Sequence, residues 1–398
     1  MKILQINNSF EKKGGAEAVF LNTIYLLRSK GNEVVTFSRK CENSSLEYSE
    51  KYFLPDKSKS NSIERYYAKQ SANLLSYLIE NEKPDVAHIH NIHGEITFSI
   101  LPVLKRNRIP IVASIHGFKY LCPAWVFING RGQICEECKS GKFYKCFLNN
   151  CSQKGKVKSF QLAVESYLRD WLIPYDNYID KFLFVSNFTQ NKFLEFNPSI
   201  LNKSSQLYNF VTQFDESSKG KHNKYFLYLG RLAYEKGIKT LVDAFKQITQ
   251  HKLIIAGNGP LEEFVKQNEN DNIEYVGYKN GNELESLIMN AFFLVVPTET
   301  YENNPMTIVE AYSKAKPVIG TNLGGIPEIV QNGKNGFLFE PKNSKQLTDV
   351  INKCSSLTNR EYSNISENAF MFAKRNFNPE NHFEKLIAVY KEILDRKN

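Results

Sequence analysis

Short apolar runs alternate with helical patterns along the whole chain. The first series of runs lies at residues 2–6, 33–37, 85–90, 111–116 and 182–186, with an amphipathic helix predicted over residues 63–81. A second series lies at residues 225–229, 253–256, 273–276, 293–296 and 318–319, each followed by a turn and a helical pattern. Continuous apolar runs of this length are typical of parallel strands buried on both faces. The alternation predicts an α/β chain of two doubly wound, Rossmann-like domains.

The domain boundaries follow from the same pattern. A chain of 398 residues is too long for one ordinary core. We expect an N-terminal domain over residues 1–205 and a C-terminal domain over residues 206–375, connected through the polar segment 197–223. Residues 376–398 hold a last helix with one apolar face, which must be buried and is expected to pack back on the N-terminal domain.

The stretch YENNPMTIVEA, residues 301–311, follows the apolar run FFLVVP and predicts the start of a helix. Asn304 is a good N-cap, and Pro305 suits the first helical position because its missing N–H is not needed there. Ligands of open α/β sheets bind at the carboxyl ends of the strands. The N–H groups of Met306, Thr307 and Ile308 are therefore predicted to point at a bound anion.

A second loop of this kind supplies positive charge. Arg231 and Lys236 follow the first strand of the second series, where they could neutralise a diphosphate; the alternative is two solvated surface cations. The sequence contains no Asp-x-Asp, the usual way of holding a metal ion on a nucleotide diphosphate. Arg231, Lys236 and the helix start are thus expected to balance the phosphate charge without a metal.

Charge and hydropathy limit the classes of binding partner and the cellular compartment that we expect for the protein. The net charge of +9 favours anionic partners such as phosphorylated metabolites or an acidic membrane face. Nucleic acid is disfavoured because the basic residues are scattered and no nucleic-acid-reading motif is present. The N-terminal apolar run is too short for a signal peptide, and no stretch reaches the length of a membrane span. We expect a cytoplasmic protein.

Five of the seven cysteines fall in an insertion at residues 120–155. The Cys-x2-Cys pair and the two later cysteines suit a tetrahedral structural zinc site, with reduced, unliganded thiols as the alternative. The predicted ligands are Cys135, Cys138, Cys146 and Cys151. The insertion is also rich in aromatic residues and lysines, and we expect it to shape an acceptor site.

Histidines stand at the ends of two predicted strands of the first series. His88 and His90 share one face of a strand, and His93 lies past the strand end, so a structural or acceptor-side role is preferred to metal binding. His116 ends the next strand; it is either a satisfied histidine at a strand end or a group that stabilises charge on a substrate.

The motifs GGAE, SIHG, GRLAYEKG, IIAGNGP, YENNPMTIVEA and GGIPE stand in this order over nearly the whole chain. In this order they resemble the retaining glycosyltransferases of family 4, which have the GT-B architecture of two facing Rossmann-like domains with a cleft between them. The resemblance implies that Arg231 and Lys236 bind the diphosphate, Glu310 the ribose and Glu302 the donor sugar. It implies further contacts for the glycine loop, for the backbone at the helix start and for a histidine beside the sugar: Gly14, Gly15, Asn303, Asn304, Met306, Thr307 and His116. Pro305 departs from the family, which often has Gly there, and it removes one backbone donor.

By this resemblance the protein is a retaining, metal-independent hexosyltransferase without a catalytic cofactor. It moves a sugar from a nucleotide-sugar donor to a hydroxyl of a glycan or lipid-linked glycan, as in cell-surface polysaccharide biosynthesis, and its charge fits peripheral contact with the inner face of the membrane. The alternatives are a nucleotide-sugar epimerase of the same fold and a non-catalytic nucleotide-sugar-binding protein. Whether Glu302 acts as a nucleophile or transfer occurs on the front side of the sugar is left open by the sequence.

Overall fold

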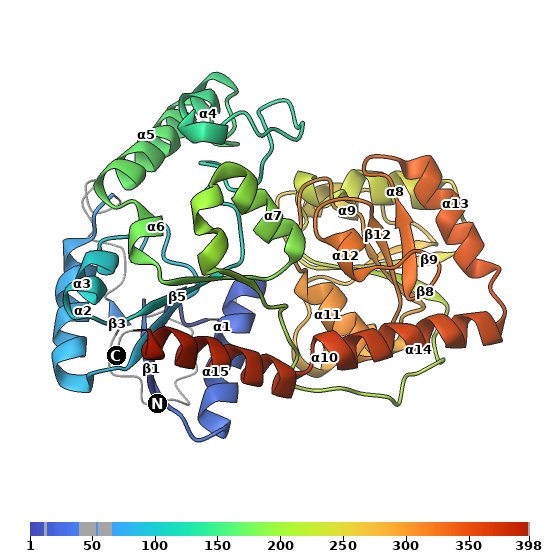
Figure 1. Cartoon of the computed structure of the whole chain (residues 1–398). Helices are drawn as coiled ribbons and strands as arrows, with labels where there is room; N and C mark the ends of the chain where they lie inside the picture. The colour runs from blue at the N-terminus through green and yellow to red at the C-terminus, as the bar shows by residue number, and fades with distance from the viewer. Residues whose placement is uncertain (12–13, 40–52, 55–65, 397–398) are drawn as a thin grey trace. The chain divides into compact units, whose positions relative to one another are not determined.

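The computed structural model describes residues 1–11, 14–39, 53–54 and 66–396, and it divides into two compact units. The first unit comprises Met1–Leu207 and Glu380–Asn398, and the second comprises Tyr208–Pro379. Both are built on parallel sheets covered by helices (Figure 1). The predicted α/β, doubly wound fold is confirmed.

The sheet of the first unit has seven strands in the order β3-β2-β1-β4-β5-β6-β7. Its strands are β1 (Lys2–Ser9), β2 (Glu33–Arg39), β3 (Phe53–Leu54), β4 (Val86–Ile89), β5 (Ile111–Ile115), β6 (Lys181–Phe184) and β7 (Ser204–Gln206). Its helices are α1 (Gly15–Ser29), α2 (Lys69–Glu82), α3 (Ile100–Arg106), α4 (Tyr144–Leu148), α5 (Lys156–Leu172), α6 (Tyr175–Tyr178) and α7 (Asn187–Phe196), with 3-10 turns η3 (Lys139–Gly141) and η4 (Pro198–Lys203). The central strands are buried apolar runs, as parallel strands covered on both faces require.

The C-terminal helix α15 (Pro379–Asp395) packs in the core of the first unit (Figure 1). Its apolar stripe, which includes Leu386, Tyr390 and Ile393, lies against residues of β1 and α1 such as Ile3 and Phe20. An ion pair between Glu392 of the helix and Lys181 of β6, 3.2 Å long, adds a polar contact. The stripe is thereby buried inside the first unit although it is the last part of the chain.

The sheet of the second unit has six parallel strands in the order β10-β9-β8-β11-β12-β13. Its strands are β8 (Tyr225–Leu229), β9 (Lys252–Ala256), β10 (Ile273–Tyr275), β11 (Phe293–Val296), β12 (Val318–Thr321) and β13 (Gly336–Phe339). Its helices are α8 (Ile238–Lys246), α9 (Glu262–Lys266), α10 (Gly281–Asn290), α11 (Met306–Ser313), α12 (Ile326–Ile329), α13 (Ser344–Ser355) and α14 (Asn359–Asn376), with the 3-10 turn η5 (Tyr234–Lys236). Both sheets reverse their strand order in the middle, between β1 and β4 and between β8 and β11, where doubly wound sheets bind ligands.

Some local expectations differ from the structure. The polar segment 197–223 contains the 3-10 turn η4 and the edge strand β7, which pairs with β6. The helix expected over residues 63–81 is α2, which begins at Lys69; residues 63–65 lie outside the described residues. Among the described residues no helix has both the length and the apolar character of a membrane span.

Candidate active site

Two loops of the second unit flank the point where its strand order reverses. One follows β8 and contains Gly230 and the turn η5; the other follows β11 and leads into α11. Gly237, with a φ of +70°, lies so close to the second loop that a Cβ there would be 1.8 Å from the carbonyl oxygen of Pro297. The carbonyl oxygen of Glu235 accepts hydrogen bonds from Thr298 Oγ1 (3.1 Å) and from the Glu299 N–H (2.9 Å). The two loops are therefore fastened together through backbone atoms.

Lys236 and Glu302 form an ion pair between these loops. Nζ of Lys236, at the end of η5, donates to Oε1 of Glu302 in the loop after β11. The Glu302 side chain is 18% exposed and that of Lys236 34%, so the pair is shielded but reachable. Burial lowers the pKa of Lys236, but the attraction of the Glu302 carboxylate outweighs it and the pKa is raised overall. Lys236 is thus a cation at neutral pH, held at the carboxyl end of the sheet.

Arg231 is the second predicted cation of this site. Its side chain is exposed, and its Nη1 lies 3.3 Å from Oε1 of Glu235. The other carboxylate oxygen of Glu235 is buried and has no hydrogen-bond partner. An exposed guanidinium tied only by a weak surface pair can turn to another anion at little cost.

The start of α11 corrects one sequence prediction. Pro305 is the N-cap, with extended dihedral angles, and α11 begins at Met306, so the predicted N-cap role of Asn304 is wrong. The side chain of Asn304 instead accepts from the N–H of Asn209 (2.9 Å), and its carbonyl oxygen accepts from Asn209 Nδ2 (2.8 Å). Asn304 therefore fastens the loop to the segment that opens the second unit.

The backbone N–H groups at the start of α11 divide into two kinds. The N–H of Ile308 donates to the carbonyl oxygen of Pro305 (3.0 Å), so this donor is used within the first turn. No described residue accepts from the N–H of Met306 or Thr307. These two donors at the positive end of a helix are the ones suited to an anion.

The loop after β12 supports the same stretch from the other side. The N–H of Gly325 donates to the carbonyl oxygen of Glu302 (2.7 Å), and a Cβ on Gly325 would lie 1.9 Å from the carbonyl oxygen of Asn303. Only glycine permits this approach. Asn303 is buried here, whereas Glu310, on the second turn of α11, is half-buried.

In the first unit, the glycine pair follows β1 and His116 follows β5, two strands that are separated in the sheet by β4. Gly14 is the N-cap of α1, whose first residue is Gly15. His116 directly follows β5, and its imidazole stacks on that of His90 with ring centroids 5.2 Å apart. Nε2 of His116 lies 3.0 Å from Nδ1 of His90.

A hydrogen-bonded chain fixes the proton positions of these histidines, and its full extent could not be predicted from any sequence motif. His90 Nε2 lies 3.1 Å from Oε1 of Gln5, and the amide nitrogen of Gln5 donates to Oη of Tyr390 (3.3 Å). Since the amide oxygen of Gln5 can only accept, His90 carries its proton on Nε2. Nδ1 of His90 then accepts, so His116 carries its proton on Nε2 as well.

The other end of the chain is His88, and burial keeps the whole set neutral. Nδ1 of His88 lies 2.6 Å from Oη of Tyr390, and its Nε2 lies 2.8 Å from Oγ of Ser114. Burial lowers the pKa of His116 to about 4, and burial, together with nearby His116 and His382, lowers that of His88 to about 3. At neutral pH these imidazoles are uncharged.

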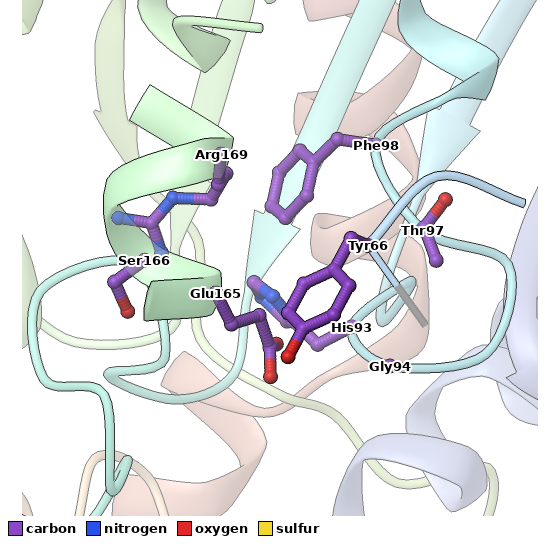
Figure 2. A pocket seen from close by; sticks show the side chains of 8 residues that line it. All are labelled: Tyr66, His93, Gly94, Thr97, Phe98, Glu165, Ser166 and Arg169. Carbon is purple, nitrogen blue, oxygen red and sulfur yellow. The ribbon is translucent and has the colours of Figure 1, made fainter. Parts of the chain in front are cut away.

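His93 lines a small pocket rather than joining the chain (Figure 2). Figure 2 shows its ring beside Tyr66 and Glu165, with Arg169 of α5 behind them. The cavity is about 20 Å³, room for about one water molecule and too small for a sugar ring. The ring of His93 also packs on Tyr120, with centroids 4.7 Å apart.

The described cysteines are free thiols. Cys138 and Cys146 are buried, whereas Cys135 and Cys151 are partly exposed. Nowhere in the described residues do three or more His, Cys, Asp or Glu side chains form a group that could hold a metal ion. The four predicted zinc ligands therefore do not assemble as a metal site in this structure; the Cys135 sulfur instead accepts from Asn149 Nδ2 at 3.6 Å.

Two parallel-sheet Rossmann-like units, with a cation and a helix start at the strand-order reversal of the second, define the GT-B class of glycosyltransferase. Residues 13–212 match the family model Glycosyltransferase Family 4, and residues 210–396 match Glycosyl transferases group 1. The chain belongs to glycosyltransferase family 4.

Relatives and solved structures agree with this assignment. An uncharacterized glycosyltransferase of Methanocaldococcus jannaschii, MJ1178, is 34% identical over 221 residues, 54% of this chain and 60% of that protein. A lipopolysaccharide 1,2-N-acetylglucosaminetransferase of Salmonella typhimurium is 28% identical over 187 residues, 43% of this chain and 49% of that protein. The chain thus spans about half the length of the relatives it matches.

The crystal structure of Anabaena HepE in complex with UDP-glucose covers 98% of this chain and 100% of its own, with a TM-score of 0.69 and 19% identity. This likeness concerns the fold.

Proposed function

We propose that the protein is a retaining glycosyltransferase that transfers a hexose from a nucleotide-sugar donor to a hydroxyl of a glycan or lipid-linked glycan. The observation that carries the proposal is the Lys236–Glu302 ion pair beside the start of α11. A cation, a carboxylate and the two backbone donors of the helix start lie together at the edge of the sheet where doubly wound folds bind nucleotides.

In this proposal the donor diphosphate joins Glu302 as a second partner of Lys236. Arg231 turns from Glu235 to the same phosphates, and the N–H groups of Met306 and Thr307 donate to phosphate oxygens. Glu302, shared between Lys236 and the substrate, then accepts from a hydroxyl of the donor sugar. Glu310, four residues into the same helix, accepts from the ribose hydroxyls.

The reaction that fits this arrangement is front-side transfer. The bond from the anomeric carbon to the diphosphate oxygen breaks, the acceptor oxygen bonds to the same face, and the acceptor proton moves to the leaving diphosphate. Lys236, Arg231 and the helix start stabilise the charge that grows on the diphosphate without a metal ion. A carboxylate held by Lys236 is a poor nucleophile, which favours this course over a double displacement through Glu302.

The first unit supplies the acceptor side. Gly14 and Gly15 bring backbone near the donor, and the insertion at residues 120–155 contributes to acceptor recognition. With its Nε2 proton directed to His90, His116 meets a sugar hydroxyl as a hydrogen-bond acceptor. The similarity to the lipopolysaccharide 1,2-N-acetylglucosaminetransferase of Salmonella typhimurium supports a cell-surface glycan as the product.

One assay tests the proposal. The protein is incubated with a panel of nucleotide sugars and lipid-linked acceptors while nucleoside diphosphate release is followed. Transferase activity requires release that depends on acceptor; donor turnover without acceptor favours an epimerase, and binding without turnover favours a non-catalytic protein. Lys236→Ala should need much more donor for the same rate, whereas Lys239→Ala, at an exposed lysine three positions further on, should behave like the wild type.

A further inference from the structure

The helices α4 and α5 of the first unit carry an exposed apolar face. Its side chains are Tyr144, Phe147 and Leu148 of α4 and Val157, Phe160, Tyr167, Trp171 and Leu172 of α5, here called the α4–α5 face. Trp171 is 79% exposed, Val157 74% and Phe160 55%. Single exposed apolar residues are normal on a protein surface, whereas a contiguous set marks an interaction site.

The contacts show that the face is contiguous. Along α5, residues 157, 160, 164, 167 and 171 recur at helical spacing, so they form one stripe. The Phe147 ring of α4 lies against Phe160 with centroids 5.8 Å apart, and the Tyr144 N–H donates to the hydroxyl of Tyr167 (3.2 Å). Figure 1 shows α4 lying alongside α5.

The stripe is not the face by which α5 packs on its own unit. That buried face is formed by Ser159, Leu162, Ala163, Ser166 and Arg169. The helix is therefore apolar on its outer side as well, which is the pattern of a helix covered on both sides. Among the described residues α4 covers this outer side only in part, because Trp171 and Val157 are among the most exposed apolar side chains.

Positive charge surrounds the α4–α5 face. Residues 138–164 contain six lysines and no Asp or Glu. Lys142, Lys154 and Lys156 are exposed and form no ion pair with any described residue. The acids nearest in sequence are already paired, Glu137 with Lys145 (3.3 Å) and Glu165 with Lys119 (3.5 Å). The face thus combines aromatic residues with unneutralised cations.

From this combination we propose that the α4–α5 face docks on an anionic lipid bilayer, with the aromatic side chains at the headgroup level and the lysines on lipid phosphates. Tryptophan, phenylalanine and leucine beside lysines are the composition of interfacial helices. A second copy of the chain fits less well, because a twofold contact would bring the lysines of both copies together. The inference concerns location and does not rest on the proposed activity.

Vesicle binding by the full chain tests the proposal. The protein is sedimented with phosphatidylcholine vesicles, with and without about 30% phosphatidylglycerol, and binding is expected only to the anionic vesicles and to weaken with salt. Phe160→Ser with Trp171→Ser should weaken binding at least about tenfold. Replacing Lys142, Lys154 and Lys156 by Gln should weaken it about a hundredfold.

Matched control variants test whether vesicle binding depends on this face or on exposed apolar and charged side chains in general. Tyr77→Ser with Met371→Ser removes two comparably exposed apolar side chains elsewhere, and a second control replaces three exposed lysines of the second unit, Lys246, Lys334 and Lys345, by Gln. Both controls should bind like the wild type.

The chain also has an intrinsic fluorescence probe of insertion into the bilayer, its tryptophans. Its two tryptophans are Trp125 and Trp171, so Trp125→Phe leaves Trp171 as the single reporter. Its emission should shift to the blue on anionic vesicles. No binding, equal binding to neutral vesicles, an unshifted emission, or self-association that the Phe160/Trp171 variant abolishes would each overturn the proposal. Because vesicle binding needs no turnover, failure here leaves the transferase assay unaffected.

Discussion

The buried histidines of the first unit should make its stability depend on pH. Burial lowers the pKa of His88 to about 3 and that of His116 to about 4, and it lowers those of His90 and His93 as well. An unfolded histidine titrates near pH 6.5, so between these values the unfolded unit binds more protons than the folded one. The stabilisation is therefore full above about pH 6.5 and is lost as the pH falls towards the folded pKa values.

The magnitude follows from the lowered pKa values of His88 and His116. One pKa unit corresponds to about 1.4 kcal/mol, so acidification from about pH 7 to about pH 4.5 removes about 2–3 kcal/mol through each of His88 and His116. The loss of about 5 kcal/mol, before His90 and His93 contribute, is comparable with the whole stability of a typical domain. The second unit contains only His222 and His251, both partly exposed, and should lose less.

Hydrogen exchange measured peptide by peptide reports the pH dependence of protection in each of the two units in one sample. After correction for the intrinsic pH dependence of exchange, peptides from β4 and β5 should lose protection at a higher pH than peptides from β11 and β12. His88→Asn should flatten the pH dependence of the first unit, whereas His222→Asn should leave it unchanged. Equal protection of β4 and β5 at neutral and acid pH would refute the reasoning.

Three substitutions probe residues of the candidate active site, two in the second unit and one, His116, in the first. Lys236→Ala should raise the KM for the donor about tenfold to a hundredfold in steady-state kinetics, because a charge-assisted hydrogen bond is worth about 1.5–3 kcal/mol; an unchanged KM would remove Lys236 from the site. His116→Ala should lower kcat by about a hundredfold or more with little change in KM, and the reverse pattern would assign it to binding. Gly325→Ala should lower the melting temperature and weaken donor binding together, since its Cβ would lie 1.9 Å from the carbonyl oxygen of Asn303; a wild-type melting curve would contradict the close approach.

The parts of the fold that could be predicted from the sequence are those with a local signal. Buried parallel strands such as β11 are continuous apolar runs, and the glycine and proline turns after them mark the sheet edge. The strand β7, by contrast, is three polar residues at the sheet edge, which carry no apolar run to reveal them. Pairing with β6 forms this strand, and pairing is a property of the whole unit.

The site shows the same division. The positions of Lys236 and Glu302 follow from motifs near strand ends. Asn304 is a residue type that suits an N-cap, but in the fold it accepts hydrogen bonds from Asn209, which is distant in the sequence. The chain from His116 to Tyr390 could not be predicted because His88 and Tyr390 are 302 residues apart. Tyr390 looks like one more apolar residue of an amphipathic helix until the fold places its hydroxyl beside His88.

The cysteine prediction rests on spacing. That spacing is compatible with a zinc site, but ligand geometry depends on where the backbone places each sulfur. Among the described residues no three His, Cys, Asp or Glu side chains form a group that could hold a metal ion, and Asn149 Nδ2 donates to the Cys135 sulfur.

The proposed function requires that Lys236, Arg231 and the start of α11 bind the diphosphate of a nucleotide. Calorimetric titration of the full chain with a nucleoside and its mono- and diphosphates tests this most directly. Affinity should rise by about a hundredfold or more from nucleoside to diphosphate, and Lys236→Ala should remove most of the gain while Lys239→Ala keeps it. Equal affinity for nucleoside and diphosphate, or an unchanged gain in Lys236→Ala, would contradict the account.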